Sequence, residues 1–254
     1  MNASPRDFLL GLCSISCCLN VSSTQSHAAA TMVNMGSARE FGVLAGTAIT
    51  VAGSTVVRGD AGTTSGTAIT GAENLTLLGT NHAGDAVTQA AQSALTMAYQ
   101  NAAAQPADFI YPEVSDLGGR TLSPGVHKGA SSLAITGALT LNGNGDSNAV
   151  WVFQAFSSLT TGSNSSVILT NGAQAGNIFW QVGSSATLGT GTQLQGSVLA
   201  LSSVTLTTGA VVEGGVYARN GAVTFDNNVA GIPEPSTSVL AAAGLMLLIR
   251  VRKP

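Results

Sequence analysis

The sequence is poor in charge and, after its first 18 residues, contains no cysteine. Charged residues make up 8% of the 254 residues, about a third of the usual share. The three cysteines are Cys13, Cys17 and Cys18, so the rest of the chain has no thiol for a disulfide, a nucleophile or a metal. Between Thr31 and Ala230 there are five basic and ten acidic side chains, a net charge of −5 without a basic cluster, which argues against nucleic-acid binding.

Residues 1–30 are typical of a secretory signal peptide. Arg6 precedes an apolar stretch from Phe8 to Val21, and the small residues of "SHAAA" follow it. We therefore expect signal peptidase to cleave after Ala28 or Ala30. A buried amino-terminal helix is the alternative interpretation of the same apolar stretch.

Residues 231–254 combine a Pro-Glu-Pro motif at 233–235 with a short apolar run and a basic end. The run extends from Val239 to Ile249 and is shorter than the about 20 residues that a spanning helix needs. This segment resembles the PEP-CTERM sorting signal of Gram-negative exopolysaccharide producers. The resemblance implies transient anchoring in the inner membrane, removal of the tail by an exosortase, and export to the cell surface. Exopolysaccharide is a further partner that it suggests.

A block of residues repeats with a period of 18 between Ser184 and Arg219. Its apolar residues alternate, which indicates strands, and the short period indicates the coils of a solenoid. Thr-Gly and Gly-Gly pairs supply tight corners. Related blocks occur at 46–50, 66–70, 131–141, 157–164 and 221–228. The apolar columns expected inside the coils are Leu188/Leu206, Leu194/Val212 and Val198/Val216.

The segment from Asn81 to Pro106 interrupts the coils with a mostly alanine stripe at helical spacing. Thr80 or Asn81 can cap its start and Asp85 suits its first turn, which predicts one helix of about 22 residues. The narrow stripe favours packing against a flat β-helix flank. We therefore predict a mainly β protein, a right-handed parallel β-helix over 31–230 with one long α-helix packed alongside.

The sequence offers little evidence of catalysis or metal binding. His82 and His127 stand in unrelated segments, which favours surface or capping roles over a metal site. Asp108, Glu113 and Asp116 cluster in a turn-rich linker, where paired carboxylates suit glycosidase chemistry and a solvated loop is the simpler interpretation. No G-x-S-x-G nucleophile motif occurs. We expect no enzyme activity, no cofactor and no metal.

Threonine is the polar residue that the repeat does supply. If the apolar residues of a coil face inward, Thr205 and Thr207 face outward, and Thr187 and Thr160 extend their rows. Thr190 and Thr208 align with Thr161 at a corner. Threonine suits strands and keeps an uncharged surface wet, which is one interpretation. The other is a flat, charge-poor face that orders water.

Residues 36–228 resemble the microbial ice-binding protein family, whose members combine a discontinuous β-helix with a flanking helix. The resemblance rests on segments such as "FGVLAGTAIT", "NHAGDAVTQAAQSALTMAY", "LAITGALTLNGNGDSNAVWVFQ" and "ARNGAVTFDNN". The family motif of the ice face, Thr, then Ala or Gly, any residue, then Thr or Asn, fits 47–50, 67–70 and 161–164. Residues 190–193 and 208–211 keep only its first half. The candidate ice-binding residues are Thr47, Thr50, Thr161, Thr187, Thr190, Thr192, Thr205, Thr207 and Thr208.

The resemblance implies an ice-binding protein, secreted or on the cell surface, that uses a flat Thr-rich β-helix face as an antifreeze or an inhibitor of ice recrystallisation. Its partner is ice or the ordered water next to ice. A structural or adhesive protein of the extracellular biofilm matrix, built on the same scaffold, is the alternative. A polysaccharide-active β-helix enzyme is a weaker third.

Both terminal signals predict processing during export. We expect secreted material to begin near Ala29 or Thr31 and to end near Pro233, since both signals are removed. Intact-mass measurement of the protein from the cell surface checks this. A mature protein that retains Met1 or the basic tail at 250–254 contradicts it.

Overall fold

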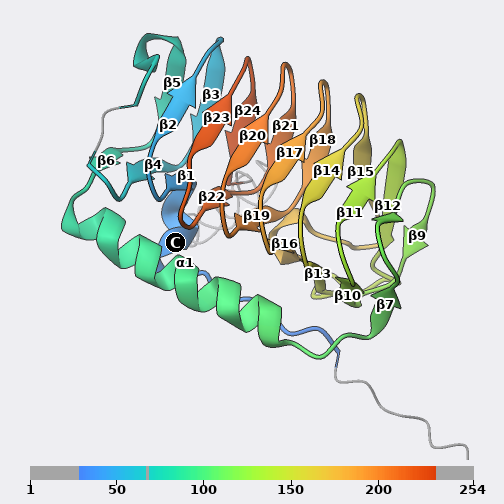
Figure 1. Cartoon of the computed structure of the whole chain (residues 1–254). Helices are drawn as coiled ribbons and strands as arrows, with labels where there is room; N and C mark the ends of the chain where they lie inside the picture. The colour runs from blue at the N-terminus through green and yellow to red at the C-terminus, as the bar shows by residue number, and fades with distance from the viewer. Residues whose placement is uncertain (1–28, 67–68, 233–254) are drawn as a thin grey trace, which may run out of the picture.

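The structure is a computed structural model that describes residues 29–66 and 69–232, which form a stack of β-helical coils (Figure 1). The proposed signal peptide and sorting signal fall mainly on residues 1–28 and 233–254, which lie outside the described residues. The strands form three sheets, each paired in parallel, so the prediction of a mainly β parallel β-helix is confirmed. No helix among the described residues is long and apolar enough to cross a bilayer.

We name the sheets A, B and C and give their strands in spatial order. Sheet A consists of β6 (Asn81–Ala83), β4 (Asp60–Thr63), β1 (Phe41–Ala45), β22 (Val216–Ala218), β19 (Ser197–Ala200), β16 (Ile178–Val182), β13 (Trp151–Ala155), β10 (Gly125–Gly129) and β7 (Phe109–Tyr111). Sheet B consists of β2 (Ile49–Val51), β23 (Val223–Phe225), β20 (Val204–Leu206), β17 (Ala186–Leu188), β14 (Leu159–Thr161), β11 (Leu133–Ile135) and β8 (Ser115–Asp116). Sheet C consists of β5 (Leu75–Leu78), β3 (Thr55–Arg58), β24 (Val229–Gly231), β21 (Val211–Glu213), β18 (Gln193–Gln195), β15 (Ser166–Thr170), β12 (Ala138–Asn142) and β9 (Thr121–Leu122).

The order of the coils in space differs from their order in the chain. Strands β1 to β6 build one end of the stack, and the helix α1 (Ala86–Ala104) then carries the chain to the other end (Figure 1). The remaining coils return, and β22, β23 and β24 pair with β1, β2 and β3. The discontinuous β-helix is therefore closed by strands from opposite ends of the described chain.

The interior consists of apolar columns in register. The expected pairs lie opposite each other in neighbouring strands, and their side chains are almost wholly buried: Leu188 with Leu206, Leu194 with Val212, and Val198 with Val216. Because coils are about 4.7–4.9 Å apart, each side chain packs on the one above it. The 18-residue period of the sequence thus corresponds to one turn of the β-helix.

Helix α1 has 19 residues and a length of about 28 Å, which lets it run beside most of sheet A. Its amino-terminal cap is Asp85, whose carboxylate accepts a hydrogen bond from the Thr88 N–H at 2.7 Å. The expectation of a cap at Thr80 or Asn81 was wrong, because Asn81 begins β6 and Gly84, with a φ of +66°, turns the chain before the helix. The helix is shorter than predicted for the same reason.

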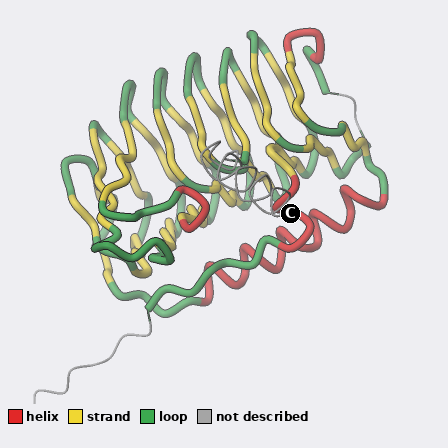
Figure 2. The backbone as a smooth tube through the Cα atoms, turned by 180° about the vertical axis from the view of Figure 1, so that it is seen from behind, coloured by secondary structure: helices red, strands yellow, loops and turns green. Residues whose placement is uncertain are grey.

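Sheet A is covered on its outer side. Its strands β1, β13 and β16 are buried at every position, as expected for strands with both faces packed. Leu95 and Ala98 of α1 and Val33 of the amino-terminal segment pack over it in one buried cluster. Seen from behind, α1 follows the same side of the stack (Figure 2). The Gln154 side chain donates to the carbonyl oxygens of Ala102 and Gln105, at 2.8 and 2.9 Å, and so caps the end of the helix.

His127 lies inside the coils, which corrects the expectation of a surface or capping role. Its ring stacks between Phe109 and Phe153, with centroid distances of 4.6 and 5.1 Å, and only 1% of the residue is exposed. Nδ1 lies 2.9 Å from the Tyr111 hydroxyl and Nε2 lies 3.0 Å from the Ser123 carbonyl oxygen. The neutral ring satisfies both partners by accepting from the hydroxyl and donating to the carbonyl. Burial lowers the pKa of His127 from its ordinary value of 6.5.

The lowered pKa predicts a loss of stability in mild acid. The unfolded chain binds a proton at His127 as the pH falls through 6.5, whereas the folded chain stays neutral there until lower pH. The contribution of His127 to stability is therefore complete above pH 6.5 and is lost as the pH falls toward its folded pKa. We expect the drop in melting temperature between about pH 7.5 and about pH 5.5 to be smaller in His127→Phe than in the parent. Equal drops in the two proteins contradict a buried neutral histidine.

Candidate functional site

Only one of the three sheets offers a broad, open and uncharged face. Sheet A is covered by α1 and the amino-terminal segment. The outer side of sheet C carries an ion pair, with Arg58 Nη1 3.4 Å from Glu213 Oε1, and a mixture of other side chains that includes Val211 and Gln193. Sheet B remains, and its short strands alternate between buried apolar and solvent-facing residues.

A single row of threonines follows the middle of sheet B. Each lies directly opposite the next in parallel register, so the row runs along the axis of the stack. With a coil spacing of about 4.7–4.9 Å, its six members span about 24 Å. The row consists of Thr70, Thr50, Thr224, Thr205, Thr187 and Thr160. We call it the threonine row.

Serine forms a second column beside the row, two residues before the threonine in several coils. Ser132 and Ser158 share a hydroxyl–hydroxyl hydrogen bond of 2.8 Å. The Ser185 hydroxyl accepts from the Ser203 N–H at 3.3 Å. These hydroxyls therefore link two pairs of neighbouring coils beside the threonine row.

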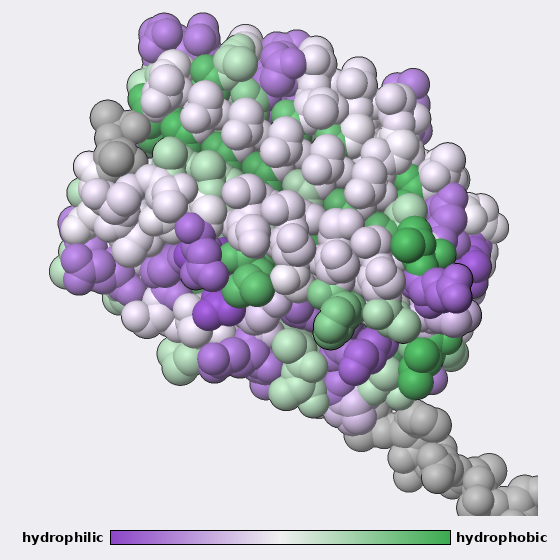
Figure 3. Space-filling model, in the orientation of Figure 1, coloured by the Kyte–Doolittle hydropathy of each residue, from purple (hydrophilic) through white to green (hydrophobic). Residues whose placement is uncertain are grey.

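Charge is confined to the margins of sheet B. Within its strands the sole ionisable residue is Asp116 of β8, beyond the row. Burial acts to raise the pKa of Asp116, but hydrogen bonds from the Gly118 and Thr136 N–H groups outweigh it and lower the pKa. Asp226 directly follows the last residue of β23, at the lateral margin of the sheet. In the view of Figure 3 the surface over sheet B is mostly pale, and strongly hydrophilic side chains gather around it.

The structure brings some of the predicted threonines together on this face. Thr50, Thr187 and Thr205 lie in the threonine row. The corner between sheets B and C holds Thr190 and Thr207, whose hydroxyl oxygens are 3.3 Å apart, and Thr208. Thr47 is exposed at the opposite corner, before β2.

The structure corrects the prediction that Thr161 and Thr192 belong to the exposed face, because both side chains point into the protein. They are 4% and 1% exposed, and their hydroxyl oxygens are 2.6 Å apart. Thr161 also accepts a hydrogen bond of 2.8 Å from the Gly189 N–H. Since alternation along β14 places Thr160 outside, the next residue must face inside.

Three members of the threonine row are absent from the candidate ice-binding residues, and of these alternation along the coil assigns only Thr160 to an outward row. The other two are Thr224 and Thr70. Thr224 lies in the partial coil at 221–228, and matching that coil to the preceding one, with a shift of one residue, would have placed it beside Thr205. Thr70 lies in the second "GTAIT" block and bridges to Thr50. The internal repeat thus carried a signal for both positions.

The acidic linker does not form a convergent pair. Asp108 accepts a hydrogen bond of 2.7 Å from the Val126 N–H, and Asp116 holds the two N–H groups named above. Both carboxylates are thereby engaged with backbone of the terminal coils. The described residues contain no cluster of three or more His, Cys, Asp or Glu suited to a metal ion.

Fold and face together define a parallel β-solenoid with one open, repetitive surface. The sequence profile of the Ice-binding-like family matches residues 43–230. An ice-binding protein of Nostoc sp. (strain HG1) is 43% identical over 252 residues, with 91% of each chain covered. One of Flavobacterium frigoris (strain PS1) is 34% identical over 229 residues, which cover 84% of this chain and 81% of that protein.

Solved structures agree with these sequence matches. The crystal structure of an ice-binding protein from the Antarctic ascomycete Antarctomyces psychrotrophicus superposes with a TM-score of 0.78 at 41% identity. The match covers 81% of this chain and 100% of that one. This chain belongs to the ice-binding-like family.

Substitutions at the adjacent residues Thr160 and Thr161 of β14 test which of the two side chains contributes to stability. Thr161→Val leaves the Gly189 N–H without its acceptor, so we expect the free energy of unfolding to fall by about 1–2 kcal/mol. Thr160→Val makes the same chemical change on the exposed side and should cost within about 0.5 kcal/mol. Denaturant unfolding of both variants measures the difference, and equal losses contradict the assignment of an inner and an outer threonine.

Proposed function

We propose that this protein binds ice through sheet B, with the threonine row at the centre of the contact surface. The observation that carries the proposal is the register of six threonines along one uncharged face. Sheet A is covered, and sheet C carries the Arg58–Glu213 pair. Membership of the ice-binding-like family supports the same activity.

The chemistry of the row suits recognition of a lattice of water. Each threonine presents a hydroxyl and a methyl group, and its branched Cβ restricts χ1, so little side-chain freedom is lost on contact. A single hydrogen bond contributes only about 0.5–1.5 kcal/mol net, so affinity depends on many hydroxyls placed at regular intervals. The paired strands beneath keep those intervals fixed, and waters held between the side chains extend the contact.

Binding of this kind supports an antifreeze role or inhibition of ice recrystallisation outside the cell. Residues 1–30 and 231–254 support secretion, with signal peptidase and an exosortase acting on the chain. The site of action would be the surface of a Gram-negative bacterium, after transient anchoring in the inner membrane and next to exopolysaccharide.

A structural or adhesive matrix role on the same scaffold is less well supported, because the sequence relatives are named for ice binding. A binding role is also favoured over catalysis. The carboxylates of Asp108 and Asp116, two of the three acidic residues that the sequence offers for acid–base chemistry, hold backbone N–H groups.

Tyrosine at Thr187 tests the proposed face. The ring would stand above neighbours about 4.7–4.9 Å away and hold the sheet off the ice lattice. We expect affinity for ice to fall roughly tenfold or more, equivalent to about 1.4 kcal/mol, and thermal hysteresis to fall with it. The melting temperature should hardly change, because Thr187 is exposed.

Gln193→Tyr is the matched control, because Gln193 is exposed in the same coil on sheet C. It should leave ice affinity and thermal hysteresis at the parent values. If Thr187→Tyr binds ice like the parent while Gln193→Tyr loses binding, sheet C is the ice face. If the parent shows neither hysteresis nor ice affinity, the proposed function is wrong.

A further inference from the structure

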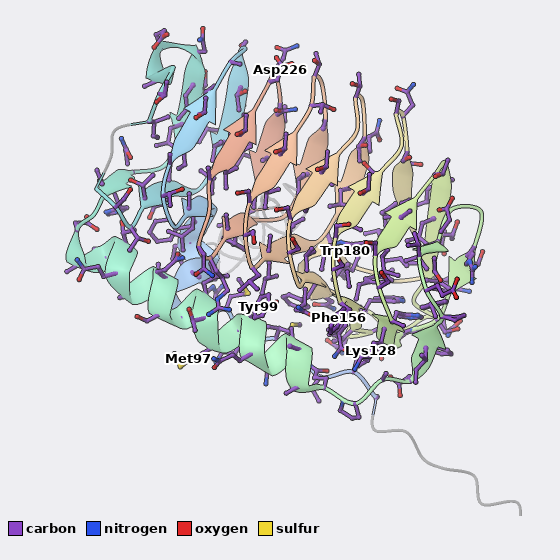
Figure 4. All side chains as sticks on the ribbon, in the orientation of Figure 1. Met97, Tyr99, Lys128, Phe156, Trp180 and Asp226 are labelled. Atoms are coloured by element: carbon purple, nitrogen blue, oxygen red, sulfur yellow. The ribbon has the colours of Figure 1, made fainter. Side chains whose placement is uncertain are left out.

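Asp226 places a carboxylate at the edge of the proposed ice face. It lies two residues after Thr224 of the threonine row, on the same outer side of the chain, and its side chain is half-buried. Figure 4 shows it at the corner between sheets B and C, at the opposite side of the stack from α1. Its neighbours at this corner are Thr208 of the preceding coil and Gly53 of the next.

Asp226 also engages the Thr208 hydroxyl, which is then not free to donate to water on the face. The Thr208 hydroxyl donates to Oδ2 of Asp226 at 2.5 Å, so that its proton points along the corner. No ion pair joins Asp226 to any basic side chain in the described part of the chain. The negative charge is therefore balanced by water, which the carboxylate orients around itself.

A flat contact with ice requires this water to be released or rearranged. A carboxylate is strongly hydrated, and taking it out of water without a partner is costly. Its hydration shell follows the charge rather than the even spacing of the threonines. The hydration shell of Asp226, at the corner beyond Thr224, thus disturbs the ordered water over the threonine row that passes beside it.

We propose that Asp226 limits the strength of ice binding and the width of the face. This inference rests on the proposed function of sheet B. Neutralising the side chain should widen the usable face toward Thr207 and Thr208 and strengthen binding to ice. Asp116, the other marginal carboxylate, is a poorer probe because it holds two backbone N–H groups of the end coils.

Asp226→Asn is the direct test, because asparagine keeps an acceptor for the Thr208 hydroxyl and removes the charge. We expect thermal hysteresis and adsorption to ice to increase severalfold relative to the parent. Asp226→Glu retains the charge and should show no gain. Asp146→Asn makes the same change of net charge in the exposed turn after β12, away from sheet B, and should behave like the parent.

The outcomes separate this inference from the proposed function. If the parent protein has no affinity for ice, the proposed function itself is wrong. If the parent binds ice and Asp226→Asn binds it no more strongly at an unchanged melting temperature, the role of Asp226 is overturned. An equal gain in Asp146→Asn also overturns it, because net charge and not position would then explain the effect.

Discussion

The pairing of the last coil with the first is the interaction on which the rest of the structure depends. Strands β22, β23 and β24 lie beside β1, β2 and β3, although more than half of the chain separates them. Without this junction the chain would form two short stacks, each with exposed strand edges. The threonine row crosses the same junction, because Thr224 lies opposite Thr50. The continuity of the candidate face is therefore a consequence of chain closure.

Helix α1 makes the closure possible and decides which faces remain open. It carries the chain along the stack, so that the returning coils arrive beside the first ones. Its alanine-rich side and the amino-terminal segment cover sheet A, where Gln154 and Tyr99 join helix and sheet through hydrogen bonds to backbone carbonyls. A covered sheet cannot meet a flat partner. Only sheets B and C therefore leave the outward-facing polar residues of the repeat exposed.

The sheet B face owes its regularity to polar groups that are not part of the proposed contact. Inside the corner, Asn228 donates to the carbonyl oxygens of Thr207 and Ala210, and the Thr161 and Thr192 hydroxyls pair. At the other corner, serine hydroxyls link neighbouring coils. Because these bonds satisfy buried or half-buried polar groups, they keep the coils in register at little cost in free energy. Threonine has two roles in one strand, structural inside and exposed outside.

The sequence by itself determined the architecture and most of the row. The period of 18 identified the coils and their apolar columns, and alternation placed Thr187 and Thr205 on an outer side, since side chains along a strand must alternate. A local stripe sufficed for α1, because helical periodicity is a short-range property.

Only the tertiary structure decided the rest. It placed Thr192 inside, because the direction of a side chain at a corner depends on how the chain bends there, whereas alternation with Thr160 along β14 already directs Thr161 inward. It buried His127 between Phe109 and Phe153, residues that are distant in sequence but stack in space. It also joined Thr224 to Thr50, because the register between distant strands is set by hydrogen bonds that no local pattern contains.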